Sequence, residues 1–283
     1  MSDVATSTPT AAEILSERGA PVIVFDHVHL AFDDKVVLKD VSFTLIKGHT
    51  KIVLGASGSG KSTALKIITG LLKADSGVVW VNGQRVDQLT EHEMMAVRAD
   101  LGMIFQEGAL FDSLTVRENV GYKLYEETDM PLADVDRRVE EVLGFIALAE
   151  HIDKMPSELS GGQRRRVAIA RAMAFKPRIL LYDEATTGLD PITATTVDDE
   201  IIKLRDLEGV SSIVVTHQLR DAFYVATHMA VRNPDGEVAI VPATPEKERE
   251  AEFIMLRDGL ICFEGDADAL RKSTDPYLKE FLS

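Results

Sequence analysis

The stretch Gly55-Ala56-Ser57-Gly58-Ser59-Gly60-Lys61-Ser62-Thr63 fits the phosphate-binding pattern G-x-x-x-x-G-K-[ST]. It follows an apolar run, 52–54, that predicts a buried strand, and it leads into 64–68, where the apolar spacing predicts a helix. Glycines let the backbone turn its N–H groups inward, and the amino end of a helix adds partial positive charge. We therefore predict a polyphosphate site here; a flexible Gly/Ser linker is the alternative.

Two side chains of this loop indicate a nucleotide with a metal ion. Lys61 can reach the β- and γ-phosphates, and the Ser62 hydroxyl can ligate Mg²⁺. The loop residues expected to contact the ligand are Gly55, Ser57, Gly58, Ser59, Gly60, Lys61, Ser62 and Thr63.

Composition indicates an ordinary globular chain with an acidic balance. The 283 residues are 45% hydrophobic, and 31 basic against 46 acidic residues give a net charge of −15. Such a charge opposes a nucleic-acid backbone, so no nucleic-acid partner is expected. One cysteine, Cys262, excludes an intrachain disulfide, and neither a membrane-spanning run nor a secretory signal pattern is present. We therefore expect a cytoplasmic protein.

Strand and helix patterns alternate around the loop and predict a three-layer α/β core. Residues 1–20 read as a flexible arm with a short helix near 11–18, and 21–283 as a single domain. Polar, amphipathic sequence near 133–148 predicts a helical insert, placed at about 107–170. The expected strands are 22–25, 28–32, 41–45, 77–81, 101–106, 178–183 and 212–216, with helices at 91–98 and from Asp190-Pro191.

The region from 228 to 283 predicts a β/α extension. Strands are expected at 229–231, 253–256 and 260–263. Between them, 233–252 carries an Asn-Pro-Asp-Gly turn pattern and a charge run, which favour a solvated insertion built as a hairpin and a short helix.

Asp183 and Glu184 end an apolar strand. Because successive strand residues point in different directions, one carboxylate can face a metal while the next faces a nucleophilic water. We assign Asp183 to Mg²⁺ and Glu184 to polarising the water. The alternative, a solvated loop face, is the ordinary explanation of two acids after a strand.

The segment Ser160-Gly161-Gly162-Gln163 opens a helix. Ser160 and Gln163 form a capping-box pattern, which explains the segment as a well-started helix. The two glycines also leave N–H groups bare at a positive helix end, where an anion can dock, and both explanations can hold. The following Arg164-Arg165-Arg166 is interpreted as a solvated helix face rather than a nucleic-acid contact.

Gln106 and His217 each follow a predicted strand, at the sheet edge where α/β proteins bind ligands. Taken alone, each is more simply a surface glutamine or a satisfied histidine. Asp190 before Pro191 predicts a helix N-cap, with which a second role at an interface is compatible.

Together and in this order, these residues resemble the ATP-binding cassette ATPases, over nearly the whole chain from about 21 to 283. The resemblance implies a P-loop NTPase core with an N-terminal antiparallel β-subdomain and an inserted helical subdomain. It implies ATP and Mg²⁺ as cofactors, with Lys61, Gln106, Glu184 and His217 catalytic and Ser62, Gln106 and Asp183 at the metal. Phe32 falls where the family stacks an aromatic ring on adenine; core packing is the equal alternative.

The resemblance also implies partners. Two cassettes close head to tail, so Ser160, Gly161, Gly162, Gln163 and Asp190 would face the ATP of a second copy in a homodimer. The permease must be another chain, which would hold this one on the cytoplasmic face of the inner membrane. An inactive nucleotide-binding module is opposed by the intact set of catalytic residues, and a cassette of translation or DNA repair by the single phosphate loop.

Residues 105–120, 155–160 and 275–282 resemble the ATPases of Mla/Mce-type lipid transport systems. This implies phospholipid transport with an Mce-domain substrate-binding protein and allows a small regulatory subunit. The insertion at 233–252 is not typical of that group. The alternative is the ATPase of an amino-acid or other small-solute importer.

Overall fold

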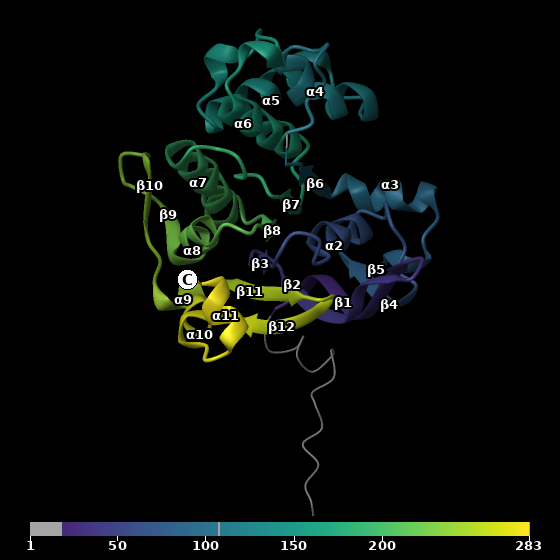
Figure 1. Cartoon of the computed structure of the whole chain (residues 1–283). Coiled ribbons are helices and arrows are strands. Elements are labelled where there is room, and N and C mark those ends of the chain that lie inside the picture. The colour runs from purple at the N-terminus through teal and green to yellow at the C-terminus, as the bar shows by residue number, and fades with distance from the viewer. Residues whose placement is uncertain (1–18, 107, 283) are drawn as a thin grey trace, which may run out of the picture.

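A sheet of six strands forms the centre of the computed structural model, which describes residues 19–106 and 108–282. The strand order is β12-β11-β3-β8-β7-β6, with β12 antiparallel to β11 and the other neighbours parallel. The carboxyl ends of the parallel strands therefore meet at one edge (Figure 1). The strands are β3 (Thr50–Leu54), β6 (Leu101–Ile104), β7 (Ile179–Asp183), β8 (Ser211–Val215), β11 (Ala251–Arg257) and β12 (Leu260–Gly265).

Apolar side chains cover both faces of this sheet. On β7, Leu180 belongs to one hydrophobic core and Leu181 to the other, because successive strand residues point to opposite faces. One core includes α7 and α8, and the other includes α2 and α3, so the predicted three-layer α/β core is confirmed. The helices around the sheet are α2 (Lys61–Ile68), α3 (Glu91–Ala99), α7 (Pro191–Glu208), α8 (Leu219–Thr227), α10 (Ala267–Lys272) and α11 (Pro276–Phe281).

An antiparallel sheet lies beside the core, in the order β2-β1-β4-β5. The prediction of two strands at 22–25 and 28–32 was wrong, because one strand spans both. Asp26 and His27 form a bulge between Phe25 and Val28, with His27 at φ 51°, so the polar pair interrupts the register but not the strand. The elements are β1 (Pro21–Phe32), β2 (Lys35–Ile46), β4 (Ser76–Val81), β5 (Gln84–Arg85) and the 3₁₀ turn η1 (Val86–Gln88).

Three helices stand above the sheet and form the helical part of the molecule (Figure 1). The predicted helix near 133–148 is α5, whereas α4, in the same insert, had no helix predicted for it. Thr115 caps α4 with a capping box to Glu118, which fixes its start. The elements are α4 (Val116–Glu127), α5 (Leu132–Phe145) and α6 (Gly161–Met173), with the 3₁₀ turns η2 (Ala149–His151) and η3 (Pro156–Glu158).

The segment 233–252 contains the hairpin and short helix that its sequence favours. β9 (His228–Arg232) pairs with β10 (Val238–Pro242), and α9 (Pro245–Glu248) follows. The carboxylate of Asp206 on α7 accepts from the Ala230 N–H at 2.8 Å and pairs with the Lys247 ammonium at 2.9 Å. These two contacts attach the hairpin and α9 to the core.

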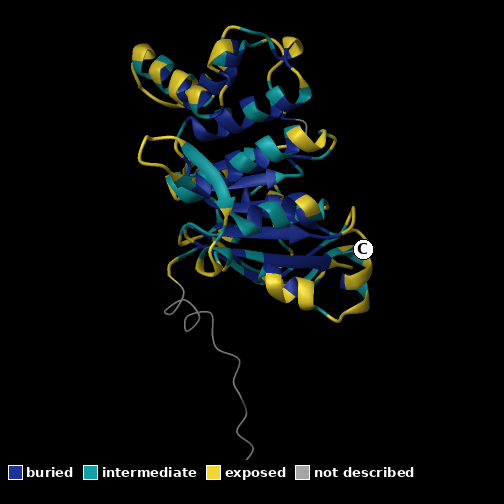
Figure 2. Cartoon of the chain, turned by 90° about the vertical axis from the view of Figure 1, so that its left-hand side faces the viewer, coloured by how far each residue is buried: buried dark blue, intermediate teal, exposed yellow. Residues whose placement is uncertain are grey.

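Burial follows this layering: the central strands β3, β7 and β8 are buried and the outer helix faces are exposed (Figure 2). Within residues 19–106 and 108–282, no helix has the length and apolar composition that crossing a membrane requires. The expected short helix near 11–18 lies outside the described residues, as do Glu107 of the Mla-like stretch and the last residue of the chain.

Candidate functional site

The loop between β3 and α2 is built from residues whose backbone only glycine adopts easily. Gly55, Gly58 and Gly60 have φ of 149°, 79° and 105°. A Cβ at Gly55 would also lie 2.4 Å from the Leu256 carbonyl oxygen. No side chain caps the N-terminus of α2. The first N–H groups of this helix and the inward-turned backbone can therefore receive an anion.

Two polar side chains of the loop point inward. The Lys61 ammonium, with its side chain 5% exposed, donates to the carbonyl oxygens of Gly55 at 2.8 Å and Ala56 at 3.0 Å. Burial lowers the pKa of Lys61, and the nearby carboxylates of Glu184 and Asp183 oppose that shift. The Ser59 hydroxyl is buried without a hydrogen-bond partner in the described chain. Both groups are suited to phosphate oxygens inside the loop.

Ser62 and Asp183 meet at the base of the loop. The Ser62 hydroxyl donates to Asp183 Oδ1 at 2.8 Å, and burial raises the pKa of Asp183, partly offset by that bond. A hydroxyl and a carboxylate are the hard oxygen donors that Mg²⁺ prefers. Within the described residues, no group of three or more His, Cys, Asp or Glu side chains is placed to hold a metal ion by itself. The site thus fits a Mg²⁺ ion that takes its other ligands from phosphate and water.

Glu184 occupies the turn directly after β7. Its φ of 51° is unusual for a residue with a side chain, and its N–H donates to the Val215 carbonyl of β8 at 2.9 Å. One carboxylate oxygen lies 3.9 Å from the Lys61 ammonium and 3.3 Å from His217 Nδ1. The other accepts from the Thr187 hydroxyl at 3.2 Å. The structure therefore brings Lys61, Glu184 and His217 together at the edge where β7 and β8 end.

Thr187 is a site residue that the sequence did not single out. Its hydroxyl holds the Glu184 carboxylate, and its N–H donates to the Glu184 carbonyl at 3.1 Å, which closes a turn. A threonine three residues after a carboxylate in a loop is a readable pattern of this kind. Gln106 lies at the same sheet edge, after β6, and is exposed; among the described residues no hydrogen bond joins its amide to the loop.

The segment Ser160–Gln163 forms the start of α6. It is not part of the wall around the phosphate loop. Ser160 is the N-cap: its hydroxyl accepts from the Gln163 N–H at 3.2 Å, while its own N–H donates to Gln163 Oε1 at 2.8 Å. The Gln163 amide contacts His151 Nε2 at 2.7 Å. A Cβ on Gly162 would lie 2.0 Å from the Thr193 methyl, so this glycine lets α6 approach α7, whereas a Cβ on Gly161 would meet only ordinary contacts, the nearest 3.8 Å away on Leu189. The capping-box explanation is confirmed.

Asp190 and Phe32 also lie apart from the carboxylates. Asp190 caps α7, since Oδ1 accepts from the N–H groups of Ile192 and Thr193, each at 3.1 Å. The Thr193 hydroxyl and N–H lower the pKa of Asp190. Phe32 is 47% exposed and belongs to neither core, so the core-packing explanation was wrong. Its strand neighbour Lys35 lines a cavity that continues from the loop.

That cavity has a volume of about 450 Å³. Tyr277, which the sequence predicted only as part of the C-terminal tail, lies in its wall, and the Arg257 guanidinium lies 4.3 Å from the centre of its ring. The arrangement leaves room for a group larger than phosphate next to the loop. The lining consists of 35–37, Lys39, 56–59, 256–259 and Tyr277.

Comparison with known proteins gives one family. The family description ABC transporter matches residues 38–187, which is 150 of the 283 residues. Methionine import ATP-binding protein MetN of Bifidobacterium longum is 39% identical over 83% of this chain and 61% of that protein. Protein TRIGALACTOSYLDIACYLGLYCEROL 3, chloroplastic, of Arabidopsis thaliana is 36% identical over 90% of this chain and 72% of that protein. The match thus spans about three fifths of the bacterial relative.

Solved structures share the architecture. The ATP-binding cassette MJ0796 in a dimeric post-hydrolysis state bound to ADP and Pi is 29% identical, with a TM-score of 0.70 over 86% of this chain and 98% of that one. CbiO1 from Clostridium perfringens, at 22% identity and a TM-score of 0.74 over 93% of this chain and 95% of that one, shares the fold. The chain belongs to the ABC transporter family and is an ATP-binding, ATP-hydrolysing cassette of that family.

Proposed function

We propose that this ATPase energises phospholipid transport between bacterial membranes through a separate permease. The observation that carries the catalytic half of this proposal is the position of Glu184, with one carboxylate oxygen near both Lys61 and His217. The sequences at 105–120, 155–160 and 275–282 carry the transport half. The Arabidopsis relative supports it as well, since its name is that of a galactosyl glycerolipid.

In the proposed site, each side chain has a distinct task. Lys61 exchanges its two loop carbonyls for phosphate oxygens, and Ser62 with Asp183 holds Mg²⁺, which supplies charge neutralisation on the phosphates. Glu184 orients and polarises the attacking water, while His217 contacts the γ-phosphate. Gln106, which follows β6 at the same sheet edge, would be a further ligand of Mg²⁺. Phe32 stacks on adenine beside the loop.

A second copy of the chain completes the proposed site. The helix start at Ser160–Gln163 shares no hydrogen bond with the phosphate loop among the described residues. An ATP γ-phosphate from the partner copy suits this positive helix end. Asp190, at the start of the adjacent α7, would line the same contact. The cassette MJ0796 has been solved as a dimer.

The other proposed partners follow from the lipid substrate. The permease holds this chain on the cytoplasmic side of the inner membrane, an Mce-domain protein captures the lipid, and a small regulatory subunit binds the helical part. The second candidate function is import of methionine or another small solute. The methionine-import relative favours it, being 39% identical over 247 residues.

The test is purification of the chain with the permease encoded beside it. Phospholipid-stimulated hydrolysis in vesicles and recovery of an Mce-domain protein are expected. Stimulation by a solute-binding protein loaded with methionine, with no response to phospholipid, would select the importer instead. If neither phospholipid nor a loaded solute-binding protein stimulates hydrolysis, while basal hydrolysis is intact, the proposed transport function is wrong and the assignment as an ATPase stands.

A further inference from the structure

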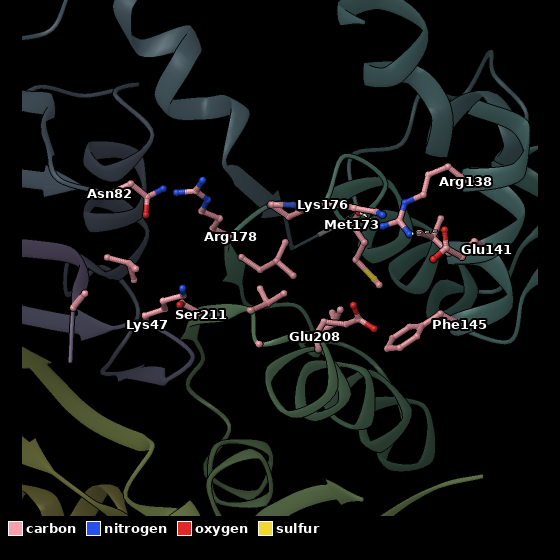
Figure 3. Close-up of a pocket in the computed structure, with 18 residues that line it drawn as sticks. Lys47, Asn82, Arg138, Glu141, Phe145, Met173, Lys176, Arg178, Glu208 and Ser211 are labelled. Atoms are coloured by element: carbon pink, nitrogen blue, oxygen red, sulfur yellow. Dashed lines mark hydrogen bonds and ion pairs between the residues drawn. The ribbon is translucent and has the colours of Figure 1, made fainter. Parts of the chain in front are cut away.

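A second cavity, of about 770 Å³, lies at the sheet edge opposite the phosphate loop. Leu180 near the start of β7 and Ser211 at the start of β8 line it, whereas Asp183 ends β7 and His217 follows β8 at the opposite edge. Residues of α5 and of the ends of α6 and α7 form one side of it (Figure 3). The other side is formed at the ends of the antiparallel strands β1, β2 and β4, by Ala20, Val22, Lys47 and Asn82. The cavity therefore lies between the helical part and the core, and none of the residues assigned to ATP lines it.

The deep part of this cavity is apolar. Each of the side chains that form it is at most 8% exposed, so these residues present a hydrocarbon surface to the cavity. A volume of this size is in the range of pockets that enclose small organic ligands, roughly 300–1,000 Å³. The apolar residues are Val22, Val142, Met173, Leu180, Leu204 and Val210.

The opening is basic although the chain is strongly acidic. Four basic and two acidic side chains line the cavity, in a protein of net charge −15. Lys47 and Lys176 are exposed, and within residues 19–106 and 108–282 neither ammonium has a hydrogen bond or ion pair. Arg178 is 70% exposed, and its ion pair, to Asp100, spans 3.7 Å. These three cations are available to an incoming anion.

The two acids do not cancel this charge. Glu141 pairs with the Arg138 guanidinium at 2.8 Å, and Arg138 also donates to the carbonyls of Met173 and Ala174. Glu208 is exposed and lies beside Phe145, on the side away from Lys47 and Arg178 (Figure 3). Charge is therefore separated across the cavity, and an anionic group is favoured at the Lys47 and Arg178 side.

We propose that this cavity binds an anionic amphiphile, a single hydrocarbon chain that ends in a carboxylate or a phosphate. The chain lies along the apolar wall, and the head group meets Lys47 and Arg178. The ligand would bridge α5 to β7 and β8, and so bind together with ATP. This inference rests on the cavity alone and stands whether or not the proposed lipid transport is correct.

Binding is tested on the full chain with four twelve-carbon probes below their micelle concentrations, by titration calorimetry and by the midpoint of thermal unfolding. Dodecanoate and dodecyl phosphate are expected to bind and raise the midpoint. Dodecyltrimethylammonium and dodecyl maltoside, which have the same chain without negative charge, are expected not to bind. A difference between the two anions identifies the preferred head group.

Two variants locate the binding. The double change Lys47→Glu and Arg178→Glu alters exposed side chains and is expected to weaken dodecyl phosphate binding on the order of tenfold or more. Ala20→Trp blocks the opening from an exposed position and tests the apolar part. Lys279→Glu, which alters an exposed lysine on α11, is the matched control and should bind normally. Basal ATP hydrolysis should be unchanged in all three.

Three outcomes would overturn the proposal. Equal binding of the cationic and anionic probes would reduce the site to unspecific apolar adsorption. Displacement of dodecyl phosphate by Mg·ATP would place it at the phosphate loop. Binding that appears only after removal of residues 1–18 would assign the cavity to that segment, which precedes the lining residue Ala20 in the sequence.

Discussion

His217 Nδ1 lies 3.3 Å from Glu184 Oε1, across the ends of two neighbouring parallel strands. Because β7 and β8 pair in register, with Asp183 opposite Val215, the residues that follow them arrive at the same edge together. The sheet therefore brings the carboxylate and the histidine to the same edge, one and two residues beyond the paired strand ends.

Glu184→Gln should keep ATP binding and lower hydrolysis by a factor on the order of 10²–10⁴, because the amide cannot accept a proton from the attacking water. Single-turnover hydrolysis and equilibrium ATP binding measure the two effects separately. Near-normal turnover in this variant would remove Glu184 from the proposed role.

Thr187→Val should lower the rate of hydrolysis by roughly tenfold with little change in ATP affinity, because it removes the 3.2 Å hydrogen bond that orients Glu184 and keeps the side-chain shape. Thr187→Ser retains the hydroxyl and serves as the control. If valine and serine give the same rate, the hydroxyl does not position the carboxylate.

Gly162→Ala should lower the free energy of unfolding by about 1–3 kcal/mol, because the new methyl group would overlap the Thr193 methyl of α7. Thr193→Ser removes that methyl and retains the 2.6 Å hydroxyl bond to Asp190, so it should recover most of the loss in the double variant. Urea unfolding of the four proteins gives the coupling. An additive result would mean that the helices do not meet at this pair.

Asp198→Asn should stabilise the protein at pH 7.5 by about 1–3 kcal/mol, and less at pH 5. Burial, and then the charge of Asp221 on α8, raises the pKa of Asp198 from 3.8 to about 8; Arg220 opposes this and Asp199 adds to it. The folded chain thus keeps a proton that the unfolded chain loses, so the free energy of unfolding falls as the pH rises from about 4 to about 8. Thermal unfolding across this range measures the slope.

The asparagine removes the titrating group, so the variant should lack that slope. Asp129→Asn, an exposed change outside this contact, is the control and should retain it. If the Asp198 variant shows the same pH dependence of the free energy of unfolding as the wild type, the proton that the folded chain retains is bound by another group.

Local chemistry explains which parts of the fold could be predicted. The loop 55–63 needs a strand before it and a helix after it, and both are present because glycine and apolar patterns act over a few residues. The helix α4 was not predicted, because its apolar residues Val116, Val120 and Leu124 are surrounded by polar residues. The pair Thr115 and Glu118 is nevertheless a capping-box pattern that indicates where the helix starts. The merged strand β1 could not be foreseen, since a bulge tolerates polar residues that otherwise indicate a turn.

The sequence could predict which residues belong to the candidate site but not how they are arranged in space. Asp183, Glu184 and His217 each follow an apolar run, which a sequence shows, whereas strand order brings their runs together. The placement of Phe32 outside both cores depends on the exposed end of β1, and the approach of Thr193 to Gly162 depends on helix packing. Such contacts between distant segments leave no local pattern in the sequence.

The larger hydrophobic core has a consequence for how the molecule unfolds. Val120 of α4, Ile169 of α6 and Tyr182 of β7 belong to one uninterrupted set of buried side chains. Melting of the three upper helices would expose the face of β7 that they share, so their amides and those of β7 should exchange hydrogen with solvent at similar free energies. The helical part and the catalytic strand thus form a single cooperative unit, and a force applied to one is opposed by the other.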